Sequence, residues 1–92
     1  MKIDPIHIIK SDERGVIYDC GKSNFIHRKK WTISADHQHE SPETIYLVSW
    51  EVELTIANET IIVESPVTFS IPWNTYHKLV ALTDIDMVID RY

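Results

Sequence analysis

Residues 45–56 read IYLVSWEVELTI, and this stretch decides the fold class. It is rich in β-branched and aromatic residues, which are typical of strands. From Trp50 onward, apolar and polar side chains alternate along the chain. One face carries Trp50, Val52, Leu54 and Ile56, and the other carries Glu51, Glu53 and Thr55. A period of two is the pattern of a strand with one buried face, so the segment predicts a half-buried strand.

Further short strands are expected on both sides of this stretch. Residues 57–60, Ala-Asn-Glu-Thr, predict a hairpin turn in which Asn58 takes the left-handed conformation. The other strand candidates are residues 6–9, 16–18, 25–35, 61–63, 67–71, 76–82 and 85–91. No segment keeps an apolar period of 3.6 for about ten residues, as a helix would. Many short strands separated by turns predict an all-β sandwich or barrel.

Length and composition limit the class of protein. The chain has 92 residues, of which 43% are hydrophobic, so we expect one domain spanning residues 1–92. No apolar run approaches the roughly 18 residues of a membrane span, and Asp4 and Pro5 interrupt the region where a signal peptide would be apolar. Cys20 is the only cysteine, which rules out an internal disulfide and suggests a small buried side chain in a cytoplasmic protein.

The charge balance argues against a nucleic-acid partner. The net charge is −5, with seven bases and four acids in residues 1–30 and only two bases against ten acids in residues 31–92. Nucleic-acid-binding proteins usually present a basic face. The one basic run, Arg28-Lys29-Lys30, is expected to be a solvated turn or strand edge.

The histidines carry the strongest chemical signal. His37 and His39 are two residues apart, which places both on one face of a strand. Followed backwards, that face also carries Trp31, Ile33 and Ala35, so the imidazoles are expected to point into the interior. Glu43 follows, and His77 lies in a later strand, in register with Leu79 and Ala81. Three imidazoles and a carboxylate suit a divalent transition metal and leave two octahedral positions open. His7 and His27 belong to no pattern and are expected at the surface.

Two motifs resemble those of the cupin superfamily. The first is His37-x-His39-x-x-x-Glu43, within residues 31–50, and the second is Pro72-x-Asn74-x-x-His77, within residues 66–81. The resemblance implies a cupin-type double-stranded β-helix, that is, a small jelly-roll barrel. It also implies that His37, His39, Glu43 and His77 ligate one metal ion, which would be iron, manganese, nickel or zinc.

The family's glycine positions are occupied differently in this chain. They are Trp31, Trp50, Pro66 and Asn74, and the family's final asparagine is Ala81 here. Asn74 is a mild change because asparagine tolerates a positive φ. Five aromatic residues are candidates for lining a pocket: Tyr46, Trp50, Phe69, Trp73 and Tyr76. Burial in the core is the favoured reading of the first three, whereas Trp73 and Tyr76 flank the turn before His77 and are equally compatible with the barrel mouth.

Cupins perform many reactions, so the resemblance does not select one. The first hypothesis is a metal-dependent cupin that acts on a small polar molecule, as an isomerase, epimerase or dioxygenase. The alternative is a non-catalytic module that binds a small ligand, since the motifs offer no second carboxylate or lysine for proton transfer. A cupin that has lost its metal is the third. The resemblance also implies a homodimer, for which the apolar segment 6–9 would supply an edge strand.

Overall fold

The computed structural model describes residues 1–37 and 42–90, and this part of the chain forms ten strands and no helix. Accordingly, it holds no helix that is long and apolar enough to cross a membrane. The strands are β1 (His7–Asp12), β2 (Gly15–Asp19), β3 (Ser23–Arg28), β4 (Ile33–His37), β5 (Glu43–Ser49), β6 (Glu51–Ile56), β7 (Glu59–Glu64), β8 (Val67–Ile71), β9 (His77–Ala81) and β10 (Ile85–Asp90).

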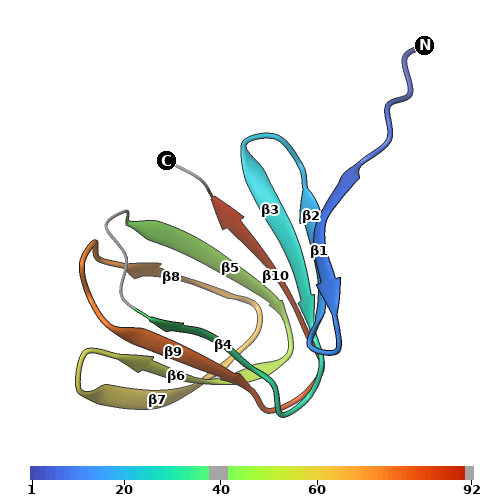
Figure 1. The fold of residues 1–92 in the computed structure, drawn as a ribbon. Helices are drawn as coiled ribbons and strands as arrows, with labels where there is room; N and C mark the ends of the chain where they lie inside the picture. Colours follow the sequence, from blue (N-terminus) through green and yellow to red (C-terminus); the bar gives the residue numbers. More distant parts are fainter. Residues whose placement is uncertain (38–41, 91–92) are drawn as a thin grey trace.

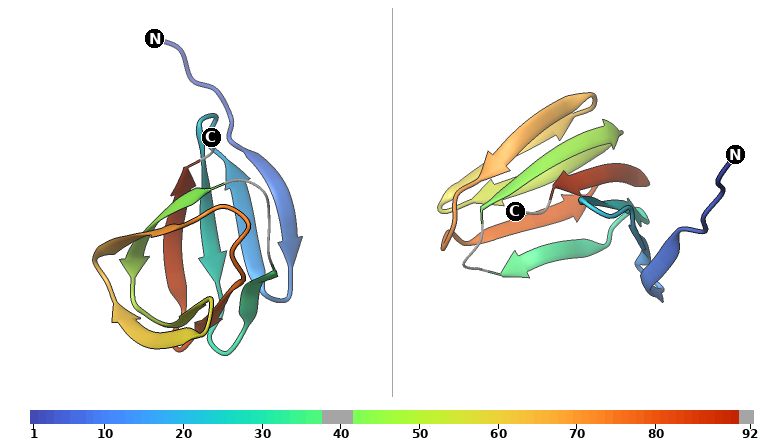
Figure 2. Two further views of the ribbon diagram at one scale, coloured as in Figure 1. Left: turned by 90° about the vertical axis from the view of Figure 1, so that its left-hand side faces the viewer. Right: turned by 90° about the horizontal axis from the view of Figure 1, so that it is seen from above.

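The strands form two antiparallel sheets that face each other (Figures 1 and 2). The larger sheet has the order β1-β2-β3-β10-β5-β8, and the smaller has the order β4-β9-β6-β7. Strands that are distant in sequence are therefore neighbours, such as β3 with β10 and β4 with β9. Two facing sheets with these long-range pairings are the architecture of a jelly roll, and the predicted all-β class is confirmed.

The core lies between the two sheets. It consists of the buried apolar residues Ile26, Ile45, Leu47, Val52, Leu54, Ile71, Leu79, Ala81, Ile85 and Met87. Val52 and Leu54 are 0% and 2% exposed, which confirms the alternation predicted for β6. Phe69 is partly buried and packs against this core, as expected.

The segment 45–56 differs from the prediction in one respect, since it forms two strands and not one. β5 belongs to the larger sheet and β6 to the smaller, and the chain changes sheet at Trp50. Trp50 is therefore 66% exposed at the crossing, and Tyr46 is 41% exposed on the outer face of β5. The favoured core assignments of Trp50 and Tyr46 are wrong, because the alternation of apolar residues does not reveal where a strand leaves its sheet.

Residues 25–35 are also divided between the sheets. β3 ends at Arg28, and the chain turns before β4 begins at Ile33. Trp31 lies in this turn with φ 68°, a left-handed conformation that bulky residues seldom adopt. Asn74 has φ 56°, in agreement with the expected tolerance of asparagine. In the β6–β7 hairpin, however, Ala57 takes the positive φ, and not Asn58 as predicted.

A bulge in β4 corrects the predicted orientation of its residues. Ile33 is 47% exposed and Trp31 65%, whereas Ser34 is buried, so the first half of β4 faces the opposite way to the prediction. Ser34 stands opposite Leu79, and His37 stands opposite His77, so three steps along β4 match two steps along β9. The extra residue of a bulge reverses the alternation.

Two single-residue expectations fail. Cys20 is exposed and not buried, because it lies in the turn after β2. Arg28 is 5% exposed, although its basic neighbours predicted a solvated site. His7 is exposed, as expected.

Candidate metal centre

His77 begins β9 inside the sandwich. Its side chain is 0% exposed, and Leu79 and Ala81 follow it on the same buried face. The ring Nδ1 lies 3.1 Å from the carbonyl oxygen of Thr75. A carbonyl oxygen can only accept a hydrogen bond, so Nδ1 carries the proton and the neutral ring has its lone pair on Nε2. A hydrogen bond to the ring nitrogen that is not a ligand fixes the tautomer of a metal-binding histidine.

His37 is brought to His77 by strand pairing. It ends β4, and its backbone stands directly opposite His77 in the antiparallel register with β9. The two residues are 40 positions apart in sequence, so only the sheet places them together. His39 lies outside the described residues.

Glu43 begins β5 at the same end of the sandwich. It stands opposite Ile71 of β8, and the short connection after Ile71 leads directly to His77. Glu43 is half-buried, and the next residue on its face, Ile45, is 1% exposed. The carboxylate position is therefore at the rim of the core, on the inner face of the larger sheet.

The residue types at this end fit a divalent transition metal. Neutral imidazole and carboxylate together suit zinc, iron and manganese. Among the side chains that the structure describes, those of residues 1–34 and 42–90, no cluster of three or more from His, Cys, Asp or Glu is close enough to hold a metal ion. Since His39 is outside that part of the chain, the described contribution is the buried imidazole of His77, the register position of His37 and the carboxylate of Glu43.

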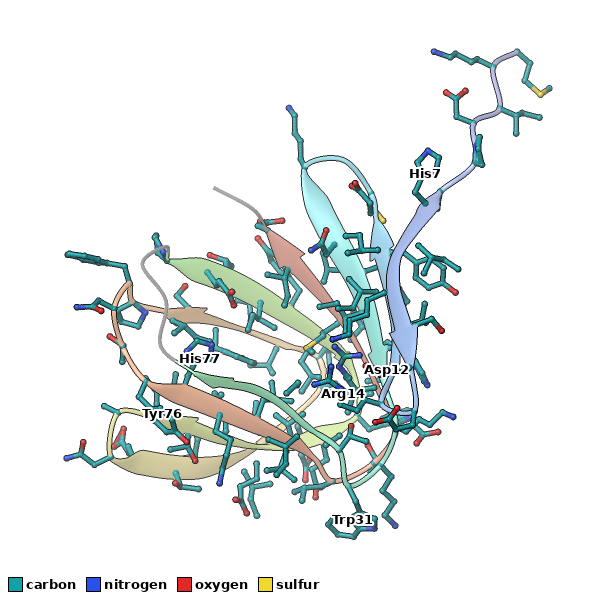
Figure 3. All side chains as sticks on the ribbon, in the orientation of Figure 1. His7, Asp12, Arg14, Trp31, Tyr76 and His77 are labelled. Carbon is teal, nitrogen blue, oxygen red and sulfur yellow. The ribbon has the colours of Figure 1, made fainter. Side chains whose placement is uncertain are left out.

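The candidate pocket aromatics are spread over the molecule. Trp73 is 62% exposed and Tyr76 39%, in the segment that leads to His77 (Figure 3). Phe69 lies on the inner face of β8, opposite Ile45. Tyr46 points outward, and its hydroxyl donates to Asp90 at 3.0 Å. Trp50 borders a surface hollow with Glu51, Glu64, Ser65 and Thr83. Only Phe69, Trp73 and Tyr76 are thus near the histidine end or the interior.

Strand pairing adds one carboxylate that the motifs do not contain. Ile56 of β6 stands opposite both His77 of β9 and Glu59 of β7. Glu59, Leu54, Ile56 and Ile61 line a small cavity of about 40 Å³. No sequence signal links Glu59 to His77. They lie in one row, on either side of Ile56, only when β6 pairs with both β7 and β9.

His27 also has a partner that the sequence does not suggest. Its Nδ1 lies 2.8 Å from Asp86 Oδ1, and Ser49 Oγ donates to the other carboxylate oxygen at 3.0 Å. These residues come from neighbouring strands of the larger sheet and lie on its outer face. The serine bonds to the aspartate and not to the histidine, so this cluster lacks the arrangement of an activated nucleophile.

The sequence itself matches no protein-family model and no curated protein. The fold, in contrast, is similar to several solved structures. The capsular polysaccharide assembling protein CapF from Staphylococcus aureus matches 94% of this chain with a TM-score of 0.75 and 18% identity, and the chain spans 30% of its length. A variant of salicylate 1,2-dioxygenase from Pseudoaminobacter salicylatoxidans matches 79% of this chain and 20% of its own length, with a TM-score of 0.68 and 16% identity.

A shorter protein is similar over most of both chains. An RmlC-like cupin from Shewanella frigidimarina matches 84% of this chain and 82% of its own length, with a TM-score of 0.70 and 18% identity. At such low identities, the likeness shows a common fold and does not transfer an activity. Two facing antiparallel sheets, the strand order and these likenesses show that this chain has a cupin-type fold.

Proposed function

We propose that this cupin binds one divalent transition-metal ion through His37, His39, Glu43 and His77 and uses it to act on a small polar molecule. The observation that carries the proposal is the register of β4 and β9, which sets His37 opposite a fully buried His77. A buried imidazole whose Nδ1 proton is held by a carbonyl presents Nε2 as a ligand atom.

Each residue has a distinct part in this proposal. Thr75 orients the ring of His77 through its carbonyl oxygen, and Glu43 adds negative charge that offsets the charge of the cation. The bound ion would supply Lewis acidity toward a substrate oxygen, or redox chemistry with dioxygen if it is iron. The likeness to a salicylate 1,2-dioxygenase does not favour redox chemistry over Lewis-acid chemistry, because at 16% identity it shows only a common fold.

Glu59 is the proposed proton-transfer group. It shares a row of the smaller sheet with His77, two strands away, which corresponds to about 10 Å. A molecule that reaches from the ion across Ile56 would contact this carboxylate. Glu59→Gln is expected to lower turnover while metal content stays at one equivalent, because Glu59 is not among the ligands.

Metal content of the untagged protein is the first measurement. We expect about one equivalent of iron, manganese, nickel or zinc, and its loss after chelation. His77→Asn keeps a donor to the Thr75 carbonyl but removes Nε2, so it should lose the metal and remain folded. His27→Asn, on the outer face, is the matched control and should keep the metal. A His77→Asn protein that retains stoichiometric metal would falsify the ligand assignment.

A metal-loaded protein that turns over no small molecule would favour the alternative, a non-catalytic ligand-binding module. A protein that contains no metal and takes up none on reconstitution would favour the third hypothesis, a cupin that has lost its metal. Product analysis with candidate sugars and hydroxy acids separates these outcomes, since only the enzyme hypothesis requires a changed molecule.

We also propose that β1 mediates a homodimer. β1 pairs only with β2 and ends the larger sheet, and the first six residues extend away from the sandwich (Figure 1). Ile6, Ile8 and Ile9 are 62%, 59% and 52% exposed. An apolar edge strand is a template for pairing with another chain. Light scattering should give twice the chain mass for the wild type and a monomer for Ile8→Lys; a wild-type monomer at micromolar concentration would reject the dimer.

A further inference from the structure

Arg28 is a buried cation on the inner face of the larger sheet. It ends β3 and stands opposite Gly15 of β2 and Ile85 of β10. Its side chain is 5% exposed, and Ile26, the previous residue on the same face, is 6% exposed. Arginine does not lose its proton in proteins, so Arg28 keeps its positive charge at this largely buried position.

In the described part of the chain, no hydrogen bond or ion pair uses the Arg28 guanidinium, and Arg28 Nε is buried without a partner. Asp12 offsets the charge of Arg28 only through its own charge, without direct contact. Burial lowers the pKa of Arg28, and the nearby charge of Arg14 lowers it further. An uncompensated buried charge is costly, and a buried unsatisfied donor indicates a missing ion, water or ligand.

Asp12, the carboxylate whose charge acts on Arg28, is already bound to Arg14. Asp12 accepts from the Arg14 backbone at 2.9 Å and from Arg14 Nη2 and Nε at 3.0 and 3.3 Å. These bonds lower the pKa of Asp12 and raise that of Arg14, so the two hold each other in the charged forms. Arg14, Asp12 and Arg28 together carry one net positive charge, and Figure 3 shows Arg14 and Asp12 side by side.

The smaller sheet also contains a buried donor, opposite the middle residue of β9. Ser34 stands opposite Leu79, is 8% exposed, and its Oγ has no partner among the described residues. Ser34 follows Arg28 by six positions, across the single turn that joins β3 to β4. Each sheet therefore buries an unsatisfied donor, Arg28 Nε at the last residue of β3 and Ser34 Oγ at the second residue of β4.

This place is separate from the candidate metal centre. Ile85, at the start of β10, pairs with Arg28, whereas Asp90, at its end, pairs with Thr44, the neighbour of Glu43. The five steps between Ile85 and Asp90 span about 17 Å of strand. The two ends of the sandwich can therefore bind different groups, and a test of one is not a test of the other.

We propose that Arg28, with Arg14 beside it, binds a small oxyanion, either a carboxylate or a phosphate group, at the end of the sandwich opposite the histidines. The guanidinium is a planar fork that donates two parallel hydrogen bonds to the oxygens of such a group. Arg28 Nε is a donor that lacks a partner, and the net positive charge of Arg14, Asp12 and Arg28 selects an anion.

The test is a titration of the intact protein with sodium acetate and, separately, sodium phosphate, against sodium chloride at equal ionic strength. The nitrogen-15 and proton signals of Arg28 Nε–H, followed by NMR, should shift with saturation, and the melting temperature should rise. Acetate and phosphate serve as the carboxylate and phosphate probes, so the tighter of the two identifies the group preferred.

Variants separate the site from general salt effects. Arg28→Met fills the position without a charge, and binding should weaken by roughly tenfold or more because charge-assisted hydrogen bonds are lost. Lys22→Met removes the same charge from an exposed turn and should bind as the wild type does. The proposal is wrong if neither anion gives a saturable response in the wild type, or if Arg28→Met responds equally. The wild-type titration decides the matter even if Arg28→Met fails to fold.

Discussion

The two ends of the sandwich both bury a polar side chain, but the two side chains differ in what burial demands. His77 is fully buried and can be neutral, and a backbone carbonyl accepts its Nδ1 proton. Arg28 is 5% exposed, cannot be neutral, and has no partner among the described residues. Similar burial therefore favours a bound cation at the histidine end and a bound anion at the arginine end.

Apolar replacement of each buried polar residue should give the largest and opposite effects on stability. In metal-free chloride buffer, Arg28→Met should raise the free energy of unfolding by about 1–3 kcal/mol, because it removes a buried unpaired charge. His77→Leu should lower it by about 1 kcal/mol, since the Thr75 carbonyl loses its donor. Urea unfolding measures both. A greater loss for Arg28→Met than for His77→Leu would mean that the arginine is already compensated.

Smaller effects are expected at two of the turns that contain a left-handed residue, those of Trp31 and Asn74. Trp31, at the arginine end, has φ 68° and contacts the Lys30 ammonium at 5.1 Å from the ring centroid. Trp31→Gly should raise stability by about 0.5–1 kcal/mol, because glycine relieves the left-handed strain and outweighs the lost cation–π contact. Asn74→Gly, at the histidine end, should gain only a few tenths of a kcal/mol.

A control for these glycine variants is Trp73→Gly, which also removes an exposed tryptophan but from a position without positive φ. It should lower stability, since glycine there only adds freedom to the unfolded chain. Equal changes in melting temperature for Trp31→Gly and Trp73→Gly would show that backbone strain at Trp31 is not what limits stability.

The smallest effect concerns acid unfolding at the arginine end. Hydrogen bonds from Arg14 lower the pKa of Asp12 in the folded protein. A lowered folded pKa stabilises the protein above the unfolded value, and this contribution is lost as the pH falls through the folded pKa. Asp12→Asn should therefore flatten the decline of stability below about pH 4. Asp4→Asn, in the extended arm, is the matched control; an identical acid profile for wild type and Asp12→Asn would contradict the prediction.

Strand identity was largely predictable from local sequence. Residues 67–71 and 85–91 were expected as strands, and β8 and β10 occupy 67–71 and 85–90. Alternation also identified Val52 and Leu54 as core residues. These predictions succeed because successive side chains of a strand point to opposite faces. A difference in polarity between the faces therefore appears in the sequence as an alternation with a period of two.

The errors occurred where the chain changes sheet or adds a residue. Segments 25–35 and 45–56 are continuous in polarity pattern, yet each crosses between sheets at a tryptophan. In β4, the prediction traced the face of His37 through Ile33, which the structure exposes. His37 stands opposite His77 because of the bulge between Ser34 and His37. The polarity pattern of the sequence does not predict this bulge.

The sequence by itself determined the all-β class, the cupin fold through its motif spacing, and the types of side chain available for a metal. Only the tertiary structure decided where these residues lie: the backbone of His37 opposite His77, Glu59 in the same row beyond Ile56, and Arg28 on a buried face. The physical reason is that polarity patterns record the local environment of each strand. Pairing, bulges and burial of a charge depend on strands distant in sequence, whose register is set only when the two sheets pack together.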